Sequence, residues 1–151
     1  NYKIAHKLGL TNIEVLDPKS DKDGAGAGIV GHLDEPMDKE GFIAHVKEVF
    51  DAECIRFNSW TGEKVNRVAL CGGAGAFLIG KAIAADADAF LTGEIGYHRF
   101  FGHENELLLI ELGHFESERY TQEILREIIE KVAPQLPVYD TEVETNPINY
   151  I

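Results

Sequence analysis

The sequence predicts an α/β domain with a mostly parallel sheet and helices packed on it. The first observation is a regular alternation of short apolar, strand-like segments with amphipathic, helix-like segments from residue 65 onward. This alternation is typical of βαβ units, in which helices connect parallel strands. The second observation is the length, because a domain of about 150 residues buries roughly 68–70% of its unfolded surface. The 151 residues are therefore expected to form a single domain with a substantial core.

The first fifty residues predict the end of one helix, two strands and a packing helix. Residues 1–9 have the character of a helix that is closed by a glycine, and the segments 12–16 and 29–33 are strand-like. The segment 18–28 between them is rich in glycine and is predicted to be a loop. Apolar residues recur at helical spacing from Asp38 to Phe50, so this segment is predicted to be an amphipathic helix that Asp38 caps.

Two further strands are predicted before the regular alternation begins. The segments 54–57 and 65–71 are strand-like and flank a turn-rich stretch. The predicted order after them is helix 74–85, strand 89–92, helix 95–105, strand 107–111, helix 116–132 and strand 137–139. In open α/β sheets, polar sites gather just beyond the carboxyl ends of the strands. The segments that follow Cys71, Leu91 and Ile110 are therefore expected to lie along one edge of the sheet.

The composition excludes several classes of function. The net charge of −12 repels phosphate backbones, and no Lys/Arg cluster with interleaved aromatic residues counteracts it locally, so nucleic-acid binding is not expected. No apolar run approaches the roughly 18 residues that a membrane span requires. The two cysteines, Cys54 and Cys71, form neither a zinc-finger motif nor a disulfide scaffold. A cytoplasmic protein without a membrane partner is therefore expected.

Two pairs of residues with a spacing of four indicate a site. They are Glu94 with His98 and His114 with Glu118, and residues four apart lie on the same face of a helix. Imidazole and carboxylate are both good ligands for zinc, manganese or iron. Two ligands are too few for a complete site, because a catalytic zinc ion usually has three ligands from the protein. The alternatives are a capped helix with a surface ion pair and a helix start whose acidic residues favour the helix dipole.

The glycine-rich segment GGAGAFLIGKA is a near match to two phosphate-binding motifs and completes neither. Ala82 stands where a phosphate-binding loop has the Ser or Thr that holds magnesium, and Leu78 stands where a dinucleotide-binding motif has its third glycine. A helix start that packs closely is the simpler interpretation. Free amides that face an anion are the alternative, and nucleotide binding without catalysis is the least favoured of three functions.

Three ordered motifs resemble a known family. The segments VALCGGAGAFL, ADAFLTGEIGYH and GHFESER are similar to the C-terminal half of the Nif three-like proteins, also known as GTP cyclohydrolase I type II homologues. The segment GAGAGIVGHLDEPM matches the part that precedes the second half of that family. The resemblance covers nearly the whole chain. It implies that the 151 residues are a fragment of a longer chain that lacks its N-terminal half.

The resemblance also implies a site and an activity. It implies a centre of two divalent metal ions (zinc, manganese or iron) to which His114 and Glu118 contribute ligands, the others coming from the N-terminal half. Thr92, Glu94 and His98 map onto the substrate pocket, and His98 is the candidate for proton transfer. A metal-dependent hydrolase that acts on a small molecule and assembles as a homohexamer is implied. The alternative is a non-catalytic metal-binding scaffold or regulatory protein that forms the same hexameric ring.

Overall fold

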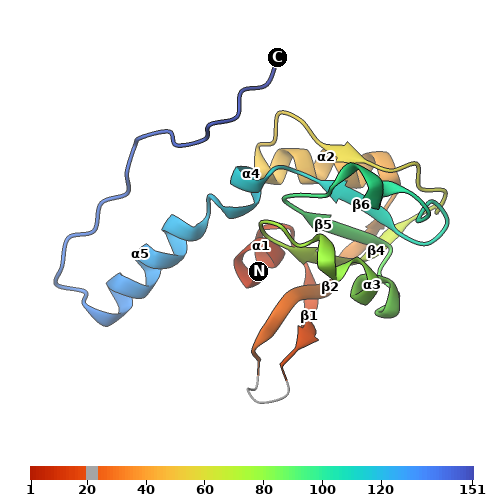
Figure 1. Ribbon diagram of the computed structural model, residues 1–151. Coiled ribbons are helices and arrows are strands. Elements are labelled where there is room, and N and C mark those ends of the chain that lie inside the picture. The colour runs from red at the N-terminus through yellow and green to blue at the C-terminus, as the bar shows by residue number, and fades with distance from the viewer. Residues whose placement is uncertain (20–23) are drawn as a thin grey trace.

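The computed structural model describes residues 1–19 and 24–151, and it confirms an α/β fold built on one six-stranded sheet. The strands are Thr11–Pro18 (β1), Gly26–Met37 (β2), Arg56–Phe57 (β3), Val65–Cys71 (β4), Ala89–Thr92 (β5) and Leu108–Glu111 (β6). Their order across the sheet is β1-β2-β4-β5-β6-β3 (Figure 1). Residues 20–23, in the loop predicted at 18–28, lie outside the described residues.

The sheet is mixed. The strands β4, β5 and β6 run parallel to one another, as the alternation predicts. The strands β1, β2 and β3 pair with their neighbours in the antiparallel sense. Antiparallel pairing of β1 with β2 follows from their connection, because a short link between neighbouring strands reverses the chain, whereas a parallel pair needs a crossover of a dozen or more residues.

The helices and turns confirm part of the predicted order and correct the rest. They are Tyr2–Lys7 (α1), Lys39–Phe50 (α2), the 3₁₀ turn Ala76–Leu78 (η1), Ile79–Ala84 (α3), the 3₁₀ turn Tyr97–Phe100 (η2), His114–Glu118 (α4) and Thr121–Val132 (α5). The helix predicted at 95–105 is wrong, because only η2 forms there, with Gly96 before it and Gly102 at φ +85° after it. The strand predicted at 137–139 does not form; Pro137 has no N–H to donate to a sheet.

The helix predicted at 116–132 is divided into α4 and α5 at Tyr120. The ring of Tyr120 is buried and packs edge-on against Phe50, with 6.0 Å between the ring centroids. The predicted cap of α2 is confirmed, since Asp38 Oδ1 accepts a hydrogen bond from the Gly41 amide at 2.7 Å. These contacts fix α2 and the start of α5 on the same side of the sheet.

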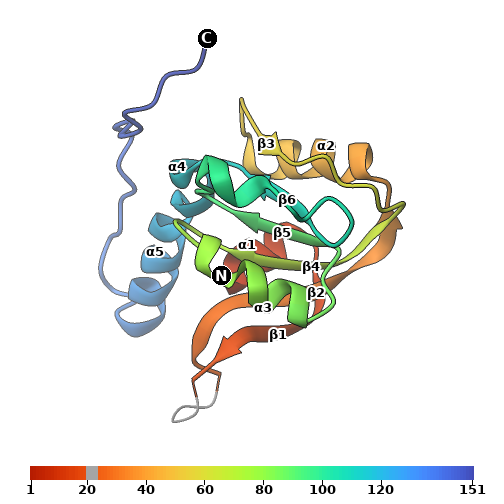
Figure 2. The same ribbon diagram turned by 45° about the vertical axis from the view of Figure 1, so that its right-hand side comes forward.

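Apolar side chains fill two layers, one on each face of the sheet. Along β4, Val68 and Leu70 point into a cluster with α1 and α2, while Ala69 points into a cluster with η1 and α3. The two sets of helices therefore cover opposite faces (Figure 2). Phe90 of β5 is fully buried on the α3 side and Phe42 of α2 on the other. The alternation follows from the period of two along a strand.

The last helix, α5, lies at one side of the sheet and buries none of its residues completely (Figure 1). Its exposed apolar residues form one line at helical spacing, here called the α5 stripe: Leu125, Ile128, Ile129 and Val132. Within residues 1–19 and 24–151, no helix combines the length and the apolar character that crossing a bilayer demands.

Candidate functional site

The candidate site lies at the sheet edge where the carboxyl ends of β4, β5 and β6 meet, as predicted. The loop after β4 and the loop after β5 touch directly, because the carbonyl of Gly73 accepts hydrogen bonds from the amides of Gly93 (2.9 Å) and Glu94 (3.2 Å). Helix α4, which follows β6, joins them through Ser117, whose Oγ accepts a hydrogen bond from the Gly73 amide at 2.9 Å. Three segments far apart in sequence therefore form one rigid edge.

The buried hydroxyl of Thr92 holds the glycine-rich loop in place. It donates a hydrogen bond to the Gly73 carbonyl at 3.0 Å and accepts one from the Gly75 amide at 2.9 Å. Thr92 is only 1% exposed, so its hydroxyl supports the loop from within the protein, and its place in a substrate pocket stays a prediction. The amides of Gly73 and Gly75 are engaged within the protein, which favours the interpretation of this loop as a closely packed connection.

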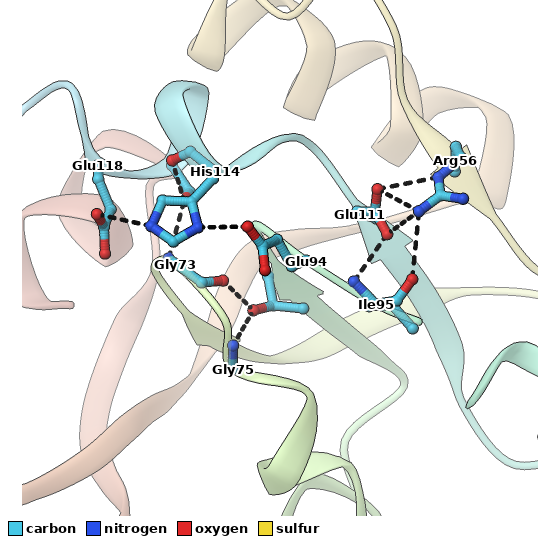
Figure 3. Close-up of polar contacts among 10 residues, drawn as sticks. Arg56, Gly73, Gly75, Glu94, Ile95, Glu111, His114 and Glu118 are labelled. Carbon is cyan, nitrogen blue, oxygen red and sulfur yellow. Dashed lines mark hydrogen bonds and ion pairs between the residues drawn. The ribbon is translucent and has the colours of Figure 1, made fainter. Parts of the chain in front are cut away.

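The imidazole of His114 lies between two carboxylates (Figure 3). Its Nδ1 is 2.7 Å from Glu94 Oε1, and its Nε2 is 3.1 Å from Glu118 Oε2. His114 begins α4, so Glu118 follows it one helical turn later on the same face, which confirms the spacing argument. The three side chains are about half exposed, at 49% for His114, 59% for Glu94 and 51% for Glu118. Each ring nitrogen thus faces a carboxylate, and all three side chains are open to solvent.

The two carboxylates favour the charged form of the imidazole. The hydrogen bond that His114 Nδ1–H donates to Glu94 is the largest cause that raises the pKa of His114, and desolvation opposes it. The negative charges of Glu118 and Glu94 raise the pKa further. In the absence of a ligand, the ring therefore holds a proton to a higher pH than an ordinary histidine does.

Glu94 does not pair with His98 as its spacing predicts. Glu94 lies before η2 in a non-helical segment, so the geometry of four residues along a helix does not apply to it. His98 lies within η2 and contacts the ring of Tyr97 edge-on, with 5.3 Å between centroids. The role of His98 in proton transfer and its place in a substrate pocket stay predictions.

A cavity of about 610 Å³ lies beside His114. Side chains from α4 and the chain segment near the C-terminus line it together with Glu94; they include Glu116, Glu118, Arg119, Asn146 and Tyr150. Thr92 and His98 lie outside this lining. The hydroxyl of Tyr150 lies 3.5 Å from Glu116 Oε1, so the C-terminal segment returns to the start of α4. The cavity is large enough to receive a small molecule.

The residues present fit part of a metal site. His114 Nε2 and Glu118 Oε2 are donors of the right chemistry, and the carboxylate on Nδ1 is the partner that metal-binding histidines ordinarily have. The space beside them is open because residue 73 is glycine: a Cβ there would meet the carboxylate of Glu118 and lie 3.5 Å from His114 Nε2. Among the described ranges, however, no three His, Cys, Asp or Glu side chains converge on one point.

Spacing alone missed the contact between Glu94 and His114, because twenty positions separate the two residues. The signal available in the sequence was indirect. Both residues follow predicted parallel strands that are neighbours in the chain, and such strands tend to be neighbours in the sheet. Ser117 lies in the segment GHFESER, between His114 and Glu118. No pattern in the sequence indicates that its hydroxyl accepts a hydrogen bond from Gly73.

The chain is similar in sequence to curated proteins that share one description. A Campylobacter jejuni protein described as "GTP cyclohydrolase 1 type 2 homolog" is 32% identical over 152 residues, covering 99% of this chain and 59% of that protein. A Pseudomonas aeruginosa protein with the same description is 32% identical over 132 residues, covering 87% of this chain and 50% of that protein. The chain therefore spans only about half to three fifths of the length of these curated relatives.

Solved structures show the same fold. A Staphylococcus aureus protein superposes with a TM-score of 0.84 at 20% identity, covering 100% of this chain and 64% of that one. A Bacillus cereus protein described as related to NIF3 gives a TM-score of 0.80 at 18% identity, covering 100% of this chain and 69% of that one. The profile of the Duf34/NIF3 (NGG1p interacting factor 3) family matches residues 1–147. The chain belongs to this family.

Proposed function

We propose that this chain contributes His114 and Glu118 to a centre of two divalent metal ions in a metal-dependent hydrolase. The observation that carries the proposal is the approach of His114 Nε2 to Glu118 Oε2 at 3.1 Å, with the opposite ring nitrogen already held by Glu94. Zinc, manganese and iron are the candidate ions, because imidazole and carboxylate donors suit them. These two side chains fall short of the three protein ligands that a catalytic zinc ion usually has, so the complete centre requires further ligands.

Each side chain has a separate role in this proposal. Glu94 accepts a hydrogen bond from Nδ1–H of His114, which leaves the Nε2 lone pair available for metal coordination. Glu118 supplies an anionic oxygen one helical turn away. Bound ions of this kind lower the pKa of a coordinated water molecule and so supply a nucleophile near neutral pH. The cavity beside His114 receives the substrate, and the description of the relatives makes GTP the first small molecule to assay.

Metal analysis tests the proposal. The protein, loaded with zinc or manganese and dialysed, is compared with a His114→Ala, Glu118→Ala double variant by elemental analysis. We expect the double variant to lose metal. A His103→Ala, Glu106→Ala variant is the matched control, since it removes another His–Glu pair, 3.8 Å apart, outside the site. Equal metal content in all three proteins refutes the assignment.

A second candidate is a non-catalytic metal-binding scaffold that assembles as a homohexameric ring. The α5 stripe supports it, because contiguous exposed apolar surface commonly marks contacts with other proteins. Turnover separates the two candidates. Hydrolysis of nucleotides or phosphoesters that is lost in Glu118→Gln, with folding and oligomeric state unchanged, supports the enzyme. A stable oligomer that binds metal and turns over none of these substrates supports the scaffold.

A further inference from the structure

The ion pair between Arg56 and Glu111 lies across the sheet edge from His114 (Figure 3). Arg56 is in the edge strand β3 and pairs in register with Glu111 at the end of β6. Arg56 Nε and Nη2 donate hydrogen bonds to Glu111 Oε1 at 2.9 Å and 2.6 Å, and Nη2 also donates to Glu111 Oε2, so the guanidinium engages both carboxylate oxygens. The guanidinium also lies over the ring of Phe100, 5.6 Å from its centroid. Bidentate pairs of this type fix orientation as well as charge.

This ion pair holds both backbone polar groups of Ile95. The Ile95 amide donates a hydrogen bond to Glu111 Oε2 at 2.7 Å, and the Ile95 carbonyl accepts one from Arg56 Nη2 at 3.2 Å (Figure 3). The side chain of Ile95 is 1% exposed and packs in the core on the α3 side. Ile95 is therefore fixed through its amide, its carbonyl and its side chain.

Because Ile95 is fixed, the backbone of its neighbour Glu94 is also fixed. Its own amide donates to the Gly73 carbonyl at 3.2 Å, so the backbone is anchored on both sides of Glu94. Its carboxylate is 59% exposed, and an exposed glutamate side chain ordinarily samples several rotamers. With the backbone held, the carboxylate reaches His114 Nδ1 at 2.7 Å.

We propose that Arg56 and Glu111 are positioning residues that clamp Ile95 and thereby keep the Glu94 carboxylate on His114 Nδ1. The clamp thereby favours the imidazole tautomer with the proton on Nδ1, because the contact of Nδ1 with Glu94 (2.7 Å) is shorter than that of Nε2 with Glu118 (3.1 Å). Neither residue touches the candidate ligand space, and each acts through the backbone of residue 95. The inference rests on the proposed function only where it concerns metal affinity, because the clamp and the tautomer are properties of the metal-free protein.

Nuclear magnetic resonance of histidine-labelled, metal-free protein tests the tautomer directly. Spectra are recorded above the pH at which His114 loses its charge, and His114→Gln assigns the signal. We expect wild-type protein to carry the proton on Nδ1. Glu111→Gln, Arg56→Ala and Glu94→Gln each shift His114 to a mixture of both tautomers, and Arg56→Lys, which retains the charge but loses the bidentate contact, shifts it less.

The matched control is Asp17→Asn. Asp17 pairs with Lys81 at 2.8 Å from β1, at the opposite edge of the sheet, so the same acid-to-amide change removes a surface ion pair away from the site. We expect the His114 tautomer to stay as in wild type. Hydrogen exchange at the Ile95 amide accelerates in Glu111→Gln and not in Asp17→Asn.

A purely structural role for the ion pair predicts a different pattern. In that case the variants unfold at lower urea concentration, while the His114 tautomer and the Ile95 exchange rate measured in the folded state stay as in wild type. That result overturns the clamp. A tautomer shift with retained folding supports it.

Zinc titration then separates this inference from the proposed function. Loss of a partner that orients a metal-binding histidine typically weakens affinity by about 10–100-fold, so we expect a loss of this order in Glu111→Gln. If wild-type protein binds no zinc, the proposed function fails and the tautomer result alone decides the clamp. If wild type binds zinc and Glu111→Gln binds it equally well with an unchanged tautomer, only the clamp fails.

Discussion

Glu94 and His114 are joined by a contact of 2.7 Å between Oε1 and Nδ1, although they follow different strands of the sheet. The contact exists because β5 and β6 are parallel neighbours in register, with Thr92 opposite Glu111. The residues just beyond these two strands are consequently brought to the same place. The arrangement of side chains at this edge is therefore a property of sheet topology, and the short motif around His114 supplies only part of it.

The pH at which His114 loses its proton reports on this contact. The Glu94 hydrogen bond raises the pKa of His114 above the ordinary histidine value. A raised pKa stabilises the folded state below the unfolded pKa, and this contribution is lost as the pH rises through the folded pKa. Glu94→Gln should lower the pKa of His114 toward the ordinary range. Titration of metal-free protein by nuclear magnetic resonance measures it.

The control for this titration is Glu106→Gln, which changes a carboxylate near His103. It should leave the His114 titration where it is in wild type. An identical His114 pKa in wild type and Glu94→Gln would show that the two side chains do not interact in solution.

Replacement of Thr92 tests the support beneath the glycine-rich loop. Thr92→Val keeps the shape but removes the hydroxyl that bonds both Gly73 and Gly75, so two buried polar groups lose a partner. The Gly73 carbonyl keeps the amides of Gly93 and Glu94 as donors, so each lost hydrogen bond should cost about 0.5–1.5 kcal/mol in the free energy of unfolding. Urea unfolding measures this cost. Thr92→Ser retains the hydroxyl and should remain within about 1 kcal/mol of wild type; equal losses in the two variants would contradict the role of the hydroxyl.

Local patterns in the sequence predicted the strands at the site better than they predicted the connections. The segment 89–92 is strand β5 with the same bounds, and the cap of α2 at Asp38 follows from its first turn. Both depend on apolar periodicity and capping chemistry, which are local. The helix predicted at 95–105 failed because a glycine on each side and the bonds to Glu111 set a short 3₁₀ turn there. Those bonds join residues distant in sequence.

The same distinction applies to the site. The pairing of His114 with Glu118 is a matter of one helical turn and was predictable. The partner of Glu94 was not, because the spacing of four residues suggested His98 and the fold supplied His114. No local pattern marks Arg56 as a neighbour of Ile95, since 39 positions separate them. Residues that position a site through the backbone are therefore visible only in the folded structure.

Gly73 should be intolerant of a side chain. Its φ of +66° is a left-handed conformation, and a Cβ would meet the Glu118 carboxylate beside His114. Gly73→Ala should cost about 1–2 kcal/mol through the backbone alone and also weaken zinc binding by filling the space between the two ligands. Urea unfolding and zinc titration measure the two effects separately.

Gly80 is the matched control for this substitution. It lies in α3, and a Cβ there meets nothing within 4 Å. Gly80→Ala should stabilise the protein by roughly 0.4–1 kcal/mol, because alanine in a compatible helical position has less backbone entropy to lose on folding than glycine. Its zinc affinity should equal that of wild type. Zinc binding by Gly73→Ala as tight as that of Gly80→Ala would place the ion elsewhere.

The attachment of α5 to the rest of the domain should depend on salt. None of its residues is fully buried, and its polar side is held to α1 by Lys3 and Lys7, which pair with Glu123 at 3.3 Å and 3.2 Å. Ion pairs at the surface weaken as salt shortens the screening length to about 3 Å at 1 M. A Lys3→Met, Lys7→Met variant should therefore exchange the amide hydrogens of Thr121–Val132 faster than wild type at low salt, while the sheet stays protected. Wild-type protein in 1 M salt should exchange these amides nearly as fast as the variant does. At low salt, Lys131→Met, at the far end of the helix, should exchange them as slowly as wild type. Equal exchange in all of these proteins would mean that apolar contacts alone hold the helix.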